Sequence, residues 1–128
     1  QILGAGLGVM IAHGMFELDI LQISSKSRQG ASQGFSEIIA TFGLILVIFG
    51  GLKVRADAIP ALVGFYITSA YWFTASTSFA NPAVTLARSL SDTFAGINPS
   101  NIIMFISCQF IGMLVALILV KYIFSEKE

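Results

Sequence analysis

Long apolar stretches separated by polar segments are the feature that most constrains how this chain can fold. The hydrocarbon core of a bilayer is about 30 Å thick, and a helix needs roughly 20 apolar residues to cross it. Four stretches approach that length, at residues of about 1–16, 35–52, 58–73 and 101–124. The pattern predicts an all-α, multi-pass membrane protein, because in lipid every backbone N–H and C=O must find a partner within the protein.

The scarcity of charge supports this prediction. Hydrophobic residues make up 55% of the chain and charged residues only 11%, whereas an ordinary soluble domain has about 25% charged residues. The formal net charge is zero, which gives no reason to expect a nucleic-acid partner. The single cysteine, Cys108, is expected to be a small buried hydrophobic residue, and the single histidine, His13, a core or loop-bonded residue.

Catalytic groups are not apparent in the sequence. It contains no Ser/His/Asp set, no paired carboxylates and no glycine-rich phosphate loop. We therefore expect neither an enzyme nor a bound metal or cofactor.

Residues 74–98 do not fit a membrane crossing. They open with the polar run TASTS and reach Asn81-Pro82-Ala83. Asn81 suits the cap of a helix, and Pro82 suits the first helical position, where its missing N–H costs nothing. A helix over about 81–94 would be roughly 20 Å long, well short of a crossing. The sequence predicts a re-entrant half-helix entered through a polar loop, which is tolerated at membrane depth only inside protein or beside a water-filled cavity.

A weak internal similarity points in the same direction. The first apolar stretch begins with the sequence QILG at residues 1–4, and the last contains QFIG at residues 109–112. Similarity between corresponding spans is typical of transport folds that are built from inverted repeats.

This arrangement resembles the second repeat of the aquaporin (major intrinsic protein) family. The resemblance rests on the sequence TSFANPAVTLAR at residues 77–88, on its place between the third and fourth apolar stretches, and on the Gln-x-x-Gly pattern of the last stretch. It covers nearly the whole chain and implies a right-handed helical bundle that holds spans three to six of a six-span fold. The first repeat would be largely missing. Because the chain opens at Gln1 inside an apolar stretch, we expect a C-terminal fragment of such a protein.

The resemblance implies a passive channel for water and small neutral solutes, with Asn81, Pro82 and Ala83 at the midpoint of the pore. A helix N-terminus carries roughly half a positive charge, so two half-helices that meet end to end would oppose the passage of a cation. The Asn81 amide would donate hydrogen bonds to a passing water or hydroxyl group. The resemblance also implies a homotetramer of the full-length protein in a lipid bilayer, which for a bacterial member is the inner membrane.

Glu37 is the second informative residue. A carboxyl group near the start of an apolar span is costly unless it is paired or faces a cavity. Glu37 either extends to the membrane interface or takes the place of the buried glutamate that braces the re-entrant loop in the family. We favour the bracing role, with Gln109 and Gly112 as further supporting residues.

The expected selectivity filter departs from the family pattern. An arginine normally follows the motif directly, but Val84 stands there, and Arg88 lies one turn further along the same helix face. Arg88 either reaches the channel mouth or is an interfacial charge. Two further filter positions fall at Ser78 and Ser69 if there is no insertion. These residues predict a filter that is wider and less cationic than that of a strict water channel. Such a filter would suit glycerol-like polyols and resembles a bacterial branch linked to arsenite and related neutral metalloids.

Two alternatives remain open on sequence alone. A secondary transporter with a broken helix would usually carry more intramembrane charges than Glu37 and Arg88. A truncated or split-gene fragment would not conduct, because half a pore leaves polar backbone facing lipid.

Overall fold

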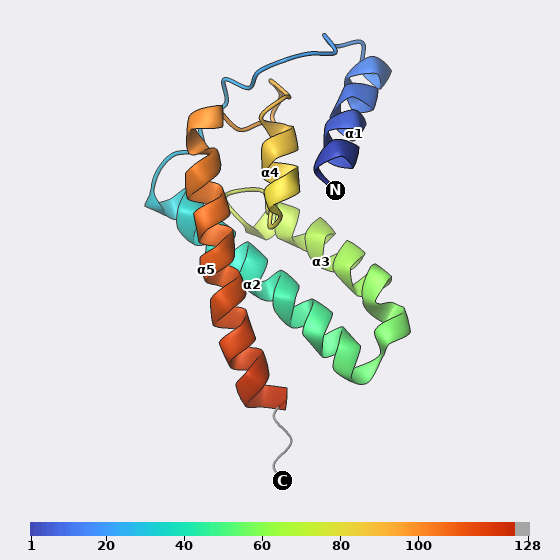
Figure 1. Ribbon diagram of the computed structural model, residues 1–128, viewed down its shortest axis with the longest axis vertical. Helices are drawn as coiled ribbons and strands as arrows, with labels where there is room; N and C mark the ends of the chain where they lie inside the picture. Colours follow the sequence, from blue (N-terminus) through green and yellow to red (C-terminus); the bar gives the residue numbers. More distant parts are fainter. Residues whose placement is uncertain (125–128) are drawn as a thin grey trace.

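The computed structural model describes residues 1–124, and over that range the chain is all-helical (Figure 1). Two short 3-10 turns, Ala56–Ala58 and Pro99–Asn101, precede the third and the last of the α-helices. The α-helices are α1 (Ile2–Met15), α2 (Ala31–Val54), α3 (Ile59–Phe73), α4 (Pro82–Arg88) and α5 (Ile102–Phe124).

Four of these helices occupy the four apolar stretches. α2 begins earlier than the stretch that predicts it, at Ala31, and extends to Val54. By length and composition, α2 and α5 could each cross a membrane, with mean hydropathies of 2.1 and 2.6. α1 and α3, with 14 and 15 residues, are shorter. That all four helices cross the bilayer remains a prediction.

α4 is shorter than the predicted half-helix, because it ends at Arg88 rather than near residue 94. Polar groups end it. The Ser89 hydroxyl donates to the Leu86 carbonyl at 2.7 Å, and the Ile97 N–H donates to the Arg88 carbonyl at 3.3 Å. Serine side chains offer the backbone bonds that compete with helix continuation. α4 is therefore only about 10 Å long at 1.5 Å per residue.

α2 and α5 form the most extensive helix pair and cross at small residues. A Cβ atom added to Gly112 of α5 would clash with the backbone carbonyl oxygen of Ile38 on α2, and one added to Gly34 would lie 3.0 Å from the Cys108 sulfur. Helices in lipid gain little from the hydrophobic effect and associate through such close contacts. Gly112 thus lies at a point where the backbones of α2 and α5 approach closely.

The segment between α1 and α2 runs over one end of the bundle, at the top of Figure 1, and is bonded to the segment that follows α4. The Ser24 N–H donates to the Ser89 carbonyl at 2.8 Å. The Ser25 N–H and hydroxyl both donate to the Asp92 carboxylate, at 2.8 and 2.9 Å. These two bonds, the backbone one first, hold the pKa of Asp92 below its ordinary value.

Large apolar side chains remain exposed on the outer faces of the helices. Leu3 on α1, Trp72 on α3 and Ile103 on α5 are each more than three-quarters exposed. Apolar surface of this extent indicates a membrane or further protein around the bundle. The small buried core, in contrast, lies where α4 meets α5 and contains Phe79 and Phe105, whose ring centroids are 5.1 Å apart.

The close approach of α2 and α5 can be tested by the substitution Gly112→Ala in the full-length protein. We expect a loss of stability of about 1–3 kcal/mol, because the added methyl group must displace the backbone of α2. Thermal unfolding in detergent would measure it. Gly50→Ala is the matched control, since a Cβ atom there meets nothing within 4 Å. Equal melting temperatures for the two variants would contradict this packing.

Candidate functional site

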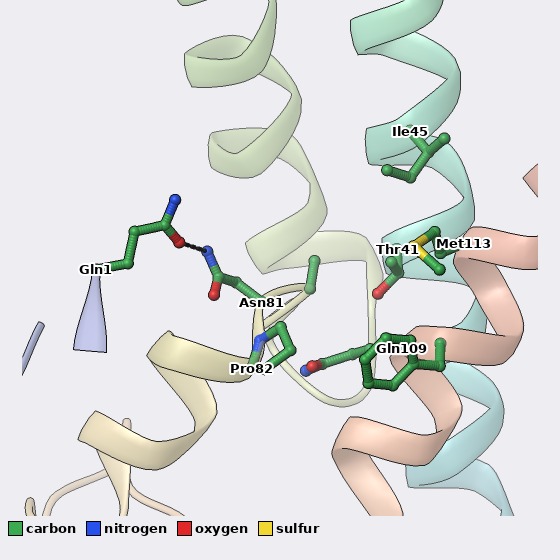
Figure 2. Close-up of a pocket in the computed structure, with 9 residues that line it drawn as sticks. Gln1, Thr41, Ile45, Asn81, Pro82, Gln109 and Met113 are labelled. Atoms are coloured by element: carbon green, nitrogen blue, oxygen red, sulfur yellow. Dashed lines mark hydrogen bonds between the residues drawn. The ribbon is translucent and has the colours of Figure 1, made fainter. Parts of the chain in front are cut away.

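Asn81 caps α4, as the sequence predicts. Its backbone is extended, with φ of −157°, and its side-chain oxygen accepts from the Ala83 N–H at 2.8 Å. Pro82 occupies the first turn, and the Thr85 N–H donates to the Asn81 carbonyl at 3.0 Å. The Asn81 amide nitrogen points away from α4 and donates to the Gln1 side chain at 3.4 Å (Figure 2). The cap therefore uses the oxygen of the amide and leaves its N–H groups directed outward.

A cavity of about 240 Å³ lies beside the start of α4 (Figure 2). Side chains of α2 and α5 face Asn81 and Pro82 across it. Two buried polar atoms on its lining, the Thr41 hydroxyl and the Gln109 amide oxygen, have no hydrogen-bond partner among the described residues. Unpaired buried polar atoms are unusual in proteins and are satisfied when water or a solute enters. The cavity thus offers hydrogen bonds next to Asn81.

The loop that leads into α4 has an unusual backbone. Thr77, Ser78 and Ala80 have φ values of 63°, 49° and 48°. Residues with a Cβ atom seldom adopt this left-handed region, which persists only where the surrounding structure holds it.

Glu37 holds this loop. Its side chain is fully buried, and its carboxyl oxygens accept from the backbone N–H groups of Phe79 and Ala80 at 2.9 and 3.0 Å. They also accept from the Ser76 hydroxyl at 2.6 Å and from the Gln109 amide at 2.8 Å. Glu37 therefore does not extend to the membrane interface. It binds α2 to the loop that positions Asn81.

Gln109 connects this carboxyl group to α4. Its amide nitrogen donates both to Glu37 and to the Thr85 hydroxyl, each at 2.8 Å. Gln109 is also buried and belongs to α5. One side chain thus joins α2, α4 and α5 next to the cavity.

Arg28, which the sequence analysis did not single out, binds the same loop. It lies in the segment between α1 and α2. Its buried guanidinium donates to the carbonyl groups of Ser76, Phe94 and Gly96 at 2.9, 2.9 and 2.7 Å. The Arg28 N–H also donates to the Asn101 side chain at 3.0 Å. Burial first, and then the neighbouring positive charge of Arg88, lower the pKa of Arg28. No periodicity or spacing in the sequence marks this residue, because its partners lie far along the chain.

The predicted filter residues have different environments. The Ser69 side chain is on the exposed surface of α3, where its hydroxyl bonds to the Phe65 carbonyl at 2.9 Å. Ser78 is buried, and its hydroxyl has no partner among the described residues. Val84 is partly buried and packs against the core around Phe79.

Arg88 bends back toward the loop. Its guanidinium carbon lies 4.3 Å from the centroid of the Phe79 ring and 5.8 Å from that of Tyr71. One of its terminal nitrogens is buried without a hydrogen-bond partner in the described part of the chain. Arg88 is therefore not an interfacial charge in solvent, but a partly buried cation stacked on aromatic rings.

The remaining single residues match their expectations in part. His13 is buried and loop-bonded, with its ring nitrogens 3.1 Å from the Ile20 carbonyl and 3.0 Å from the Ser91 hydroxyl. Cys108 is only partly buried, and its sulfur lies against Gly34 of α2.

No family model matches the chain, and no solved structure matches it. The chain is, however, 49% identical over 123 residues to aquaglyceroporin AqpS of Rhizobium meliloti (strain 1021). This similarity extends over nearly the whole chain and supports its resemblance to the aquaporin family. The aligned part is 96% of this chain and 53% of the relative, so the chain spans about half the length of that protein.

The similarity to an aquaglyceroporin bears out the resemblance to the aquaporin family and the all-α membrane fold class. The chain is a membrane protein, and the match is to a family of channels rather than of enzymes.

The bracing contacts of Glu37 can be tested by Glu37→Gln in the full-length protein. The amide keeps the size of the side chain but replaces one acceptor oxygen with a donor that would face other donors. We expect a loss of about 2–4 kcal/mol, since bonds to a charged group contribute about 1.5–3 kcal/mol each and a buried group would be left unpaired. The exposed Glu17→Gln is the control. Detergent melting curves that do not distinguish the two variants would contradict the role of Glu37.

Proposed function

We propose that the full-length protein is a passive transmembrane channel for water and small neutral solutes of the glycerol type. The observation that carries the proposal is the start of α4, where Asn81 caps the helix with its amide oxygen, leaves its amide N–H groups free of α4, and lines a cavity that also contains two unpaired polar atoms. The name of the relative, an aquaglyceroporin, supports the same solute class.

The chemistry of this site suits a neutral solute. Asn81 offers N–H donors, while Thr41 and Gln109 offer oxygen atoms that accept hydrogen bonds. A water or polyol molecule can replace its hydration with these groups as it passes. A cation would lose more hydration and would meet the positive end of α4.

The arrangement in the membrane is part of the proposal. α1, α2, α3 and α5 are taken as membrane spans, and α4 as the re-entrant half-helix that presents Asn81, Pro82 and Ala83 to the pore. The full-length protein would be a homotetramer in a bacterial inner membrane. The chain taken alone would not conduct, because half a pore leaves polar backbone facing lipid.

A broken-helix transporter agrees less well with the contacts of Glu37. Coupled transport needs an intramembrane acid or base that can bind and release an ion. The four hydrogen bonds to Glu37 already occupy its carboxyl oxygens. This carboxyl group is therefore better suited to holding the loop than to ion coupling.

The filter residues favour solutes larger than water. Ser69, Ser78 and Val84 are small, and we infer that they and Arg88 border an outer constriction that is wide enough for a polyol. Neutral arsenite, As(OH)₃, presents hydroxyl groups as a small polyol does, so it belongs to the same proposed class.

Solute uptake by the full-length protein in proteoliposomes tests this function. We expect water, glycerol and neutral arsenite to enter at rates that do not change when ion gradients are collapsed, because a passive pore needs no coupling ion. Stopped-flow light scattering measures the first two, and filtration with arsenic analysis measures the third. Permeability to water alone would contradict the proposed solute class, and uptake that stops with the ion gradient would indicate a transporter.

The substitution Val84→Arg tests the position of the constriction. We expect glycerol permeability to fall at least about tenfold relative to water permeability, because a long guanidinium side chain would narrow the path and bind its oxygens. The ratio of the two permeabilities, by stopped-flow, is the measurement. Val54→Arg, at an exposed site beside Lys53, is the matched control. An unchanged ratio in Val84→Arg would place the constriction elsewhere.

A further inference from the structure

Two guanidinium groups lie over one aromatic ring at the entrance to α4. The guanidinium carbon of Arg28 is 4.9 Å from the centroid of Phe79, and that of Arg88 is 4.3 Å from it. Arg28 comes from the segment before α2, whereas Arg88 is the last residue of α4. Both charges therefore converge on the loop that positions Asn81, although they belong to distant parts of the sequence.

This pair of cations is only partly neutralised by its surroundings. Within the described range, neither guanidinium makes an ion pair with a carboxylate within 4.0 Å. The three bonds from the Arg28 guanidinium go to neutral carbonyl groups. Glu37 of α2 is the one buried carboxyl group in the described part of the chain, and its single charge acts on both guanidinium groups but can balance only one of them. The surroundings of Phe79 thus carry an excess of positive charge.

Such an arrangement is unfavourable for folding by itself. Two like charges in a partly buried site repel each other, and burial removes part of their hydration. Stacking on Phe79 and Tyr71 compensates only in part. A charge held at this cost, next to the residues that border the proposed pore, is a candidate for a functional role.

The location of the pair suggests what that role is. Phe79 lies between Ser78 and the Asn81 cap, and Arg28 also binds the carbonyl of Ser76 in the same loop. A permeating ion would pass within a few ångströms of this loop before it reached Asn81. Over such distances, at the effective dielectric constant of a protein, one unit charge changes the entry of a cation by about tenfold or more.

We propose that Arg28 and Arg88 together form the cation barrier of this channel, in place of an arginine at the position of Val84. The barrier rests on the proposed channel function and adds two specificity-determining residues to it. Val84 leaves the constriction wide enough for neutral polyols, while the two guanidinium groups behind Phe79 keep out protons and small organic cations.

The decisive variant is Arg88→Gln in the full-length protein. Arg88 makes no side-chain hydrogen bond to another described residue, so its neutralisation removes a charge and few contacts. In proteoliposomes we expect the proton leak, followed with an internal pH-sensitive dye, and methylammonium uptake to rise about tenfold. Arg88→Lys, which keeps the charge, should remain as tight to protons and to methylammonium as wild type.

Controls separate charge from folding. Arg55→Gln removes an exposed arginine whose ion pair is with Asp57, at the turn between α2 and α3, and should leave proton leak unchanged. Arg88→Met keeps an unbranched stem against Phe79 and should leak as Arg88→Gln does, which covers the case in which the amide variant does not fold. Arg28→Lys retains the positive charge but cannot make all three hydrogen bonds to the carbonyl groups of Ser76, Phe94 and Gly96. This variant should therefore be less stable than wild type and yet exclude protons.

The outcomes distinguish the two proposals. Arg88→Gln and Arg88→Met channels that pass glycerol and exclude protons as wild type does would overturn the barrier and leave the channel function intact. A wild-type protein that passes no neutral solute would reject the channel function, and the barrier with it.

Discussion

The carboxyl group of Glu37 is the interaction on which the arrangement of this chain depends. Three residues with unfavourable left-handed backbone geometry, Thr77, Ser78 and Ala80, lie in the loop that leads into α4. Glu37 accepts the N–H groups of Phe79 and Ala80, which this geometry exposes. In an interior without water, each of those groups would otherwise be left unpaired at a cost of about 1–3 kcal/mol. The carboxyl group thereby fixes where α4 begins, and with it the direction of the Asn81 amide.

Arg28 complements Glu37 by binding the other kind of backbone group. Glu37 accepts from N–H groups of the loop before α4, while Arg28 donates to carbonyl groups before and after α4. Both therefore hold main chain rather than side chains. The side chains of Ser78 and Val84 can therefore be replaced without loss of the hydrogen bonds that Glu37 and Arg28 make to the loop. On the proposed function, the shape of the loop and the permeability of the pore therefore depend on different atoms of the same segment.

The sequence predicts the parts of this structure that follow from local or periodic signals. Apolar length marks the helices, and the Asn-Pro pair marks the cap of α4. The end of α4 is harder to predict, because it depends on the hydroxyl of Ser89 and on a bond from Ile97, which only tertiary structure brings near Arg88. Arg28 is harder still. A single arginine in a polar segment has the appearance of a solvated charge, and its partners at Ser76 and Gly96 become neighbours only in the folded chain.

In the proposed channel, the width of the constriction and the exclusion of cations depend on different residues, Val84 for the first and Arg88 against Phe79 for the second. A solute larger than water needs small side chains at the narrowest point, whereas exclusion of cations needs positive charge close to it. An arginine directly after the motif would supply charge and bulk at one place. In this chain the guanidinium group belongs to Arg88, one turn further along α4, and lies against Phe79. At that distance its electric field, which extends over several ångströms, still acts on a passing ion. Its side chain, however, no longer narrows the path. On the proposed function, width and charge can then vary independently in this channel, because the first is set by side chains that line the path and the second by cations buried beside it.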